Sequence, residues 1–279
     1  MATFTLTTEA NPIFASKNYL NQDAIDYGTF TADEMSALLP RVIDGDPFSY
    51  WQGSTSSDLT TVVLTFSLNE GSAVVSRTID LIVLQNINWK NFTGQWSPDG
   101  INWTTITTLN YASGTADNAE TDLIVNPSDI TSTAKYIRFN VTKTIVADSK
   151  KKCGGIIICA GVLQLAGGFE DYDIKYRESV RELELGDRTI SREYVMRSAA
   201  SYDFWGAGFT ASIVTEAELL LLRQIKRAGN PFVFIPEPGE NPRDAYLCHF
   251  DGAWVHKYEN PVRSIGYSIK IKVKEVGSH

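Results

Sequence analysis

Few residues in this sequence have the chemistry and spacing of a catalytic site. Apart from the terminal His279, the histidines are His249 and His256, which flank a short segment with an Asp-Gly pair. An Asp-Gly pair between short apolar runs is typical of a tight β-hairpin, which accounts for this segment without catalysis. Two carboxylate pairs, at residues 182–184 and 216–218, fit an exposed strand face and a first helical turn. We therefore expect no catalytic residues and no enzymatic activity.

Three oxygen-bearing residues could hold a hard cation. Asp44, Asp46 and Ser49 lie close together around an Asp-Gly-Asp-Pro sequence, and Ca²⁺ binds grouped oxygen ligands. The same sequence also forms a tight turn in which an aspartate bonds to its own backbone. We name these three residues as candidate metal ligands, favour the turn interpretation, and expect no cofactor.

Aromatic and polar residues that we predict to lie in loops are the candidates for ligand binding. The physical reason is that aromatic rings stack on the apolar faces of sugars. The candidates are Tyr50, Gln52, Asn88, Trp89 and Asn91. A basic run at Lys150–Lys152 is also present, and we interpret it as a solvated loop.

The composition is that of a globular protein with more than one core. The 279 residues are 43% hydrophobic and 21% charged, and this length is sufficient for two domains. The net charge of −8 argues against tight non-specific binding to nucleic acid. No apolar stretch is long enough to span a bilayer, and the N-terminal residues lack a signal-peptide pattern. We expect neither membrane insertion nor a nucleic-acid partner.

Short β-rich runs must position the candidate residues in the first half of the chain. Residues 62–68 alternate between apolar and polar types, which indicates a half-buried strand. Residues 79–84 form a nearly continuous apolar run, which predicts a strand buried on both faces, and residues 136–141 alternate again. Strands of this kind at regular spacing predict an antiparallel β-sandwich.

The second half combines strands with the clearest predicted helix, Glu216–Ala228. Thr215 and Glu218 form a capping box before its first turn, and Gly229 provides a C-terminal stop. The last predicted strand alternates apolar residues with lysines. The strands predicted in this half span residues 180–185, 190–198, 203–213, 232–235, 246–250 and 265–273.

A composition break at residues 167–178 separates two predicted domains. The first spans residues 1–168 and the second spans residues 169–279, of which residues 277–279 look like the remnant of a tag. The fold class that we predict is mainly β. An antiparallel β-sandwich comes first, and a β-rich domain with one packed α-helix follows it.

Three segments carry a family resemblance for the first domain: Ile43–Trp51, Phe92–Trp103 and Ala134–Phe139. The middle segment contains a Ser-Pro-Asp-Gly turn between two strands. In this order the segments resemble the discoidin (coagulation-factor type C) branch of galactose-binding-like domains, over residues 12–168. The resemblance implies a jelly-roll β-sandwich that serves binding or assembly.

The same resemblance has consequences for two kinds of residue. It implies that Trp51 and Trp103 pack in the core rather than stack on a ligand. Many discoidin-like relatives hold structural calcium in the loop that matches residues 44–49, with a late acidic residue completing the site. Here the matching late strand, residues 157–162, contains no carboxylate, so the sequence departs from that pattern.

The second domain resembles the tube, distal-tail and minor tail proteins of tailed bacteriophages, over residues 175–276. The resemblance rests on Phe204-Trp205, Leu219 through Ile225, residues 229–232, and Tyr267 through Glu275. It implies assembly into a ring together with other tail proteins, in a virion built in the bacterial cytoplasm. Our hypothesis is a structural tail component whose sandwich projects outward and contacts either host-surface glycans or only other tail proteins. The alternative is a lectin-like carbohydrate-binding protein without catalytic activity.

Overall fold

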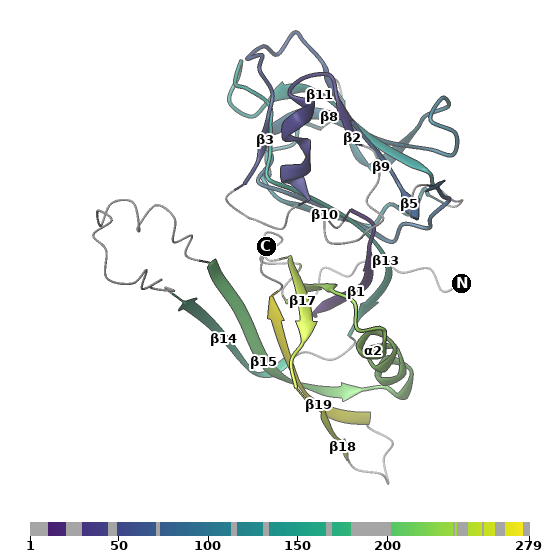
Figure 1. Ribbon diagram of the computed structural model, residues 1–279, viewed down its shortest axis with the longest axis vertical. Coiled ribbons are helices and arrows are strands. Elements are labelled where there is room, and N and C mark those ends of the chain that lie inside the picture. The colour runs from purple at the N-terminus through teal and green to yellow at the C-terminus, as the bar shows by residue number, and fades with distance from the viewer. Residues whose placement is uncertain are drawn as a thin grey trace, which may run out of the picture. The chain divides into compact units, whose positions relative to one another are not determined.

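The computed structural model describes the following residues: 11–20, 30–43, 49–70, 73–112, 116–130, 134–165, 169–179, 202–236, 238, 245–252, 254–259 and 266–275. The chain is mainly β, and its strands pair antiparallel (Figure 1). It divides into two compact units. The first contains the described residues up to Leu165 together with those from Asn230 to Leu247, and the second contains those of 166–229 and 248–277.

One sheet of the first unit has five strands, in the order β2-β4-β11-β8-β9. Its strands are β2 (Phe30–Ala32), β4 (Val62–Ser67), β11 (Tyr136–Thr144), β8 (Trp89–Ser97) and β9 (Thr104–Tyr111). The alternation predicted for residues 62–68 is confirmed, because Val62, Leu64 and Phe66 are buried while the residues between them are partly exposed.

The facing strands of the first unit follow the order β10-β7-β13-β1-β16. They are β10 (Leu123–Val125), β7 (Leu81–Gln85), β13 (Gly155–Gln164), β1 (Ile13–Asn18) and β16 (Phe232–Ile235). The apolar run predicted to be buried on both faces is β7, and Leu81–Leu84 are all fully buried. One face of these strands contributes to the main core, and the other carries a second apolar cluster that includes Val83, Val233 and Ala245.

The main core lies between the two sets of strands. Phe66 and Phe139 contribute from the five-stranded sheet, and Leu84 and Ile158 contribute from β7 and β13. Two antiparallel sheets that share one apolar core form a β-sandwich. The predicted fold class is therefore confirmed for this unit.

The Ser-Pro-Asp-Gly turn connects β8 to β9 as predicted. The Ser97 hydroxyl accepts a hydrogen bond from the Gly100 amide at 2.8 Å, and the Asp99 carboxylate accepts bonds from the Ile101 and Asn102 amides, both at 2.8 Å. Gly100 has a φ of 78°, which an L side chain rarely adopts. These bonds hold the pKa of Asp99 well below its ordinary value.

Small elements connect the longer strands of the first unit. The 3₁₀ helix η1 (Ser36–Val42) contains Pro40 and buries Leu39 and Val42. Two-residue strands also pair here, β3 (Trp51–Gln52) with β12 (Lys152–Cys153) and β5 (Asn69–Glu70) with β6 (Ala73–Val74).

The segment that contains β16 belongs to the first unit, although it follows the helix in sequence. β16 pairs antiparallel with β1, with Phe14 opposite Phe234. The rings of these two phenylalanines lie 5.1 Å apart. The chain therefore forms part of the second unit and then returns to the first. A single domain boundary near residue 168 does not account for this return.

The second unit is built around β19 (Gly266–Glu275). Along one edge it pairs with β15 (Tyr202–Val214), which pairs in turn with β14 (Phe169–Ser179). The end of β17 (Tyr246–Phe250) and β18 (Val255–Glu259) pair with different parts of β19. The predicted hairpin between His249 and His256 is therefore wrong, because both strands pair with β19 instead. The strands predicted at 180–185 and 190–198 lie outside the described residues.

The helix α2 (Glu216–Ala228) begins and ends where the sequence predicts. The Thr215 hydroxyl accepts from the Glu218 amide at 3.2 Å, and the Glu218 carboxylate accepts from the Thr215 amide at 2.7 Å. In β19, Ile269, Ile271 and Val273 are buried, and the lysines between them are exposed. Among the described residues no helix has the length and apolar character needed to cross a membrane.

Candidate binding site

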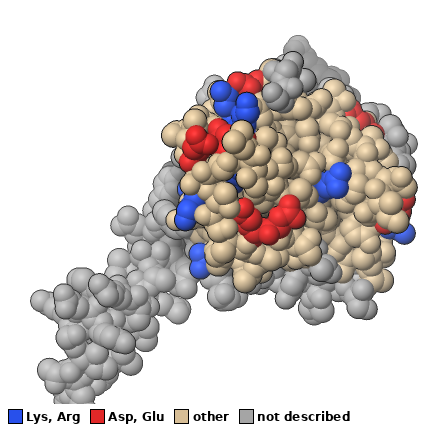
Figure 2. Space-filling model, turned by 90° about the horizontal axis from the view of Figure 1, so that it is seen from above, with Lys and Arg blue, Asp and Glu red and all other residues tan. Residues whose placement is uncertain are grey.

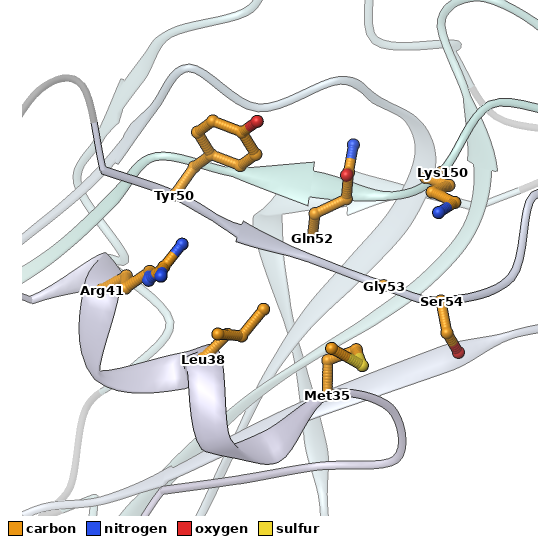
Figure 3. A pocket seen from close by; sticks show the side chains of 8 residues that line it. All are labelled: Met35, Leu38, Arg41, Tyr50, Gln52, Gly53, Ser54 and Lys150. Atoms are coloured by element: carbon orange, nitrogen blue, oxygen red, sulfur yellow. The ribbon is translucent and has the colours of Figure 1, made fainter.

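An open pocket of about 340 Å³ lies in the first unit, between η1 and the segment that contains β3 (Figure 3). Its lining combines an aromatic ring, an amide, a hydroxyl and two cations with two apolar side chains. The lining residues are Met35, Leu38, Arg41, Tyr50, Gln52, Gly53, Ser54 and Lys150.

The first wall of the pocket is η1. The buried residues Leu39 and Val42 fix this helix to the core. Met35, Leu38 and Arg41 then point toward the opposite segment, as Figure 3 shows. Met35 adopts a left-handed backbone conformation, with φ of 48° and ψ of 42°, immediately before the helix.

The second wall is the extended segment from Tyr50 to Ser54. Successive residues of an extended chain point to opposite sides. Trp51 is fully buried in the core, and Tyr50 and Gln52 therefore face the pocket. The strand pairing of β3 with β12 continues at Gly53, whose amide donates to the carbonyl of Lys151 at 2.9 Å.

Glu34 connects the two walls. Its carboxylate accepts hydrogen bonds from the Ser54 amide at 2.8 Å and the Thr55 amide at 2.9 Å. Its backbone carbonyl accepts from the indole Nε1 of Trp51 at 3.2 Å. A Cβ on Gly53 would lie 2.9 Å from the Glu34 carboxylate, so a larger residue there would displace the end of the Glu34 side chain. Hydrogen bonds from Thr55 and Ser54 lower the pKa of Glu34.

We expect Glu34 to make part of the stability of the first unit dependent on pH. Because the folded-state pKa lies below the ordinary value of 4.5, the stabilisation is complete above that pH and is lost as the pH falls through the folded-state pKa. At neutral pH, the free energy of unfolding of the Glu34→Gln variant should be lower than that of the unmodified protein by less than about 1 kcal/mol. This difference should become smaller as the pH is lowered. Urea unfolding of both proteins at a series of pH values measures it. Glu216→Gln, on the exposed face of α2, is the control, and an equal pH effect there would contradict the assignment.

The three consecutive lysines have three different environments. Lys150 is exposed and lines the pocket. The Lys152 ammonium lies 4.6 Å from the centre of the Tyr50 ring, in a cation–π arrangement. The side chain of Lys151 is fully buried, and its Nζ donates to the carbonyl of Ser57 at 2.8 Å. The interpretation of this run as a solvated loop is therefore wrong for Lys151.

Of the five predicted ligand-binding residues, the structure brings Tyr50 and Gln52 together in the pocket. Asn88 lies nearby in a structural role, because its amide group donates to the Lys150 carbonyl and its oxygen accepts from the Lys152 amide. It thereby supports the backbone that carries the lysines.

The placement of Trp89 and Asn91 in a loop is wrong, since both lie in β8 and are buried. Trp89 packs against the rings of Phe92 and Phe139 in the core. The Asn91 side chain donates to the Tyr111 carbonyl at 3.2 Å. Neither residue lines the pocket.

The prediction for the second tryptophan, Trp103, also needs correction. It is partly exposed, and the Arg138 guanidinium lies 4.1 Å from its ring centre. The neighbouring side chains form a polar network, in which Gln95 accepts from Arg138 at 2.7 Å and from Asn140 at 2.8 Å. Trp103 therefore lies with polar residues of the five-stranded sheet and outside the core.

The candidate metal ligands are only partly covered. Asp44 and Asp46 lie outside the described residues, and Ser49 is partly exposed next to Tyr50. Within the part of the chain that the structure describes, no three histidine, cysteine, aspartate or glutamate residues are grouped as metal ligands. Calcium binding by Asp44, Asp46 and Ser49 stays a prediction.

Most of the pocket lining has no signal in the local sequence. Leu38 and Arg41 belong to a 3₁₀ helix whose ends carry no strong local signal, and Met35 immediately precedes it. Ser54 is held in place by Glu34. Lys150 was recognised only as part of a charge run. The one available signal was the alternation around Trp51, which directs Tyr50 and Gln52 to the same side.

No protein-family model and no curated protein matches the sequence. Among solved structures, the chain is similar to carbohydrate-binding modules of the CBM32 class over about half of its length. One is CpGH89CBM32-6, produced by Clostridium perfringens, with a TM-score of 0.39 and 16% identity, covering 51% of this chain and 98% of that one.

Two further structures of this kind are also similar. Chitosan-binding module 1 of a chitosanase/glucanase from Paenibacillus sp. IK-5 has a TM-score of 0.36 and 19% identity, covering 52% of this chain and 99% of that one. CpGH89CBM32-5 from Clostridium perfringens, in complex with GalNAc-β-1,3-galactose, has a TM-score of 0.35 and 16% identity, covering 48% and 95%. None of these three is a phage tail protein.

Proposed function

We propose that the first unit binds a carbohydrate in the pocket between η1 and β3, and that the protein acts without catalysis. The observation that carries this proposal is the grouping of Tyr50, Gln52 and Ser54 on one wall of an open pocket. The pocket volume of about 340 Å³ lies within the range of about 300–1,000 Å³ that is typical of small-molecule sites.

The wall has the groups that a sugar ring requires. A pyranose has apolar C–H faces and a rim of hydroxyl groups. The ring of Tyr50 is partly exposed, and Lys152 covers one of its faces, so the sugar would stack on the other face. Gln52 offers both a donor and an acceptor. The Ser54 hydroxyl, which donates to the Glu34 carboxylate at 3.1 Å, offers an acceptor.

The cations at the pocket favour a saccharide with a negative charge. Arg41 and Lys150 line the pocket, and Lys152 lies beside Tyr50. The molecular face seen in Figure 2 carries acidic and basic residues in small separate groups. Because the whole chain has a net charge of −8, these nearby cations themselves must provide the attraction. A guanidinium and an ammonium suit the carboxylate of a uronic acid or a sulfate ester.

Calorimetric titration of the full chain tests this proposal. The probes are oligosaccharides matched in length, one series neutral and one series containing uronic acid. We expect saturable binding that is stronger for the acidic series. Tyr50→Ala and Gln52→Ala should each weaken it at least about tenfold, which corresponds to about 1.4 kcal/mol.

Two comparisons make the titration specific to the pocket. Gln224→Ala, on the exposed face of α2, is the control for Gln52→Ala and should bind as the unmodified protein does. Tyr50→Phe should retain most of the affinity if ring stacking dominates. Binding that is unchanged in Tyr50→Ala, or no binding by any member of either series, would contradict the proposal.

The tail-component hypothesis and the virion location rest on sequence resemblance alone. No described feature of the second unit favours them over a binding function. They therefore stay predictions. The ring that they imply can be tested by the molar mass of the full chain in solution.

A further inference from the structure

β14 is an edge strand among the described strands of the second unit. Among the described strands it pairs only with β15, and it stands last in the strand order of the sheet (Figure 1). The strand is 11 residues long. A long edge strand presents a row of backbone N–H and C=O groups that can pair with another strand.

The sequence of this strand is arranged around its middle residue, Ile174. From Asp171 to Arg177 it reads Asp-Tyr-Asp-Ile-Lys-Tyr-Arg. Acidic residues precede Ile174 and basic residues follow it at the same distances, with a tyrosine in the same place on each side. Such a sequence is complementary to itself when it is turned end to end.

An antiparallel partner with the same sequence satisfies this complementarity in one register. With Ile174 opposite Ile174 of the second copy, Asp173 lies opposite Lys175 and Asp171 lies opposite Arg177. Tyr172 then lies opposite Tyr176. Glu170 lies opposite Glu178 as a like-charged pair at the end of the strand, beyond the shift in pairing between Glu170 and Asp173. Residues at opposite positions of an antiparallel pair have Cβ atoms about 4.5–5.5 Å apart, where opposite charges and aromatic pairs stabilise the pairing.

Neighbouring registers that keep the same faces are less favourable. A shift of the symmetry axis to Asp173 places that residue opposite itself and leaves Asp171 with Lys175 as the one kind of oppositely charged pair. A shift to Lys175 places the lysine opposite itself and leaves Asp173 with Arg177 as the one kind of oppositely charged pair. Like charges directly opposite each other destabilise an antiparallel pair. The charge pattern therefore specifies the Ile174 register as well as the identity of the partner.

We propose that the protein forms a two-fold symmetric dimer through antiparallel pairing of β14 with β14 of a second copy. A two-fold interface uses the same surface of both subunits and closes after two copies. The pairing of β14 with β15 has a shift between Glu170 and Asp173 and is regular from there to Ser179. The regular part contains Ile174, Asp173 and Lys175, which set the register. Of the outer charged pair, Asp171 lies at the irregularity and Arg177 lies in the regular part, opposite Phe204.

Molar mass from light scattering of the full chain provides the first test. We expect a species of twice the 30.9 kDa chain mass. Two charge-reversal variants provide the second test. One variant combines Asp171→Lys with Asp173→Lys, and the other combines Lys175→Glu with Arg177→Glu. Each variant alone should be monomeric, because identical strands then place like charges opposite each other. An equimolar mixture of the two should restore the doubled mass.

The outcomes separate this dimer from other assemblies. A monomer at all concentrations, a trimer or hexamer, or a dimer that survives in each variant alone would overturn the proposal. Arg227→Glu, an exposed charge on α2, is the control and should leave the dimer intact. If either double variant fails to fold, Asp173→Asn with Lys175→Gln replaces it and should weaken dimerisation about tenfold. The test uses no saccharide, so it is independent of the proposed binding function.

Discussion

Replacing Trp51 with alanine is expected to lower the free energy of unfolding of the first unit by about 3–5 kcal/mol. The side chain is fully buried, and it lies in the main core at the base of the pocket wall. The substitution removes a large ring from a packed interior, and it also removes the Nε1 donor from the Glu34 carbonyl. The measurement is urea unfolding followed by circular dichroism, which does not depend on the lost fluorophore.

Trp103→Ala is the matched control for this prediction. It deletes the same side chain from a partly exposed site, where the ring contacts Arg138. We expect a loss below about 1.5 kcal/mol, made up of a cation–π contact and modest packing. Equal losses in the two variants would contradict the assignment of Trp51 to the core and of Trp103 to the sheet surface.

Replacing Lys151 with alanine is expected to destabilise the first unit by about 2–4 kcal/mol. The buried side chain donates to the Ser57 carbonyl at 2.8 Å. Burial lowers the pKa of Lys151, while the nearby carboxylates of Asp58 and Glu34 act in the opposite direction. The variant loses the packing of the stem, leaves a carbonyl without its donor, and removes the cation that these carboxylates face.

Lys150→Ala tests whether this effect belongs to the buried site or to any lysine of the run. Lys150 is exposed at the pocket, so its removal should change stability by less than about 0.5 kcal/mol. In hydrogen exchange, the Lys151 variant should lose protection in the segment that includes the Gly53 and Ser54 amides. Similar stability changes in both variants would show that the burial of Lys151 has no energetic role.

Elements whose signals are local could be predicted from the sequence. The period of two in β4, the capping box of α2 and the Ser-Pro-Asp-Gly turn each depend on a few neighbouring residues, and each is found where it was expected. β16 and β17 were also predicted within the correct residues, because turn-forming residues bound them. Residue pattern specifies such elements before tertiary contacts form.

Features that depend on distant partners could not be predicted in this way. The burial of Trp89 and the partial exposure of Trp103 depend on strand pairing. The residues next to each tryptophan in the sequence do not distinguish the two cases. Lys151 is buried where its Nζ donates a hydrogen bond to the backbone carbonyl of Ser57, which is far away in sequence. The pocket itself joins η1 to the β3 segment through Glu34, and no local pattern records that bond.

The return of the chain to the first unit has a consequence for folding during translation. β1 emerges from the ribosome early, but the edge of Ile13–Ala15 that receives β16 stays open until Phe232–Ile235 has been synthesised. β14, β15 and α2 are translated in between. Domains generally fold in order from the N-terminus. Here the first unit completes its sheet only after much of the second has left the exit tunnel, so the nascent units fold in an interleaved order.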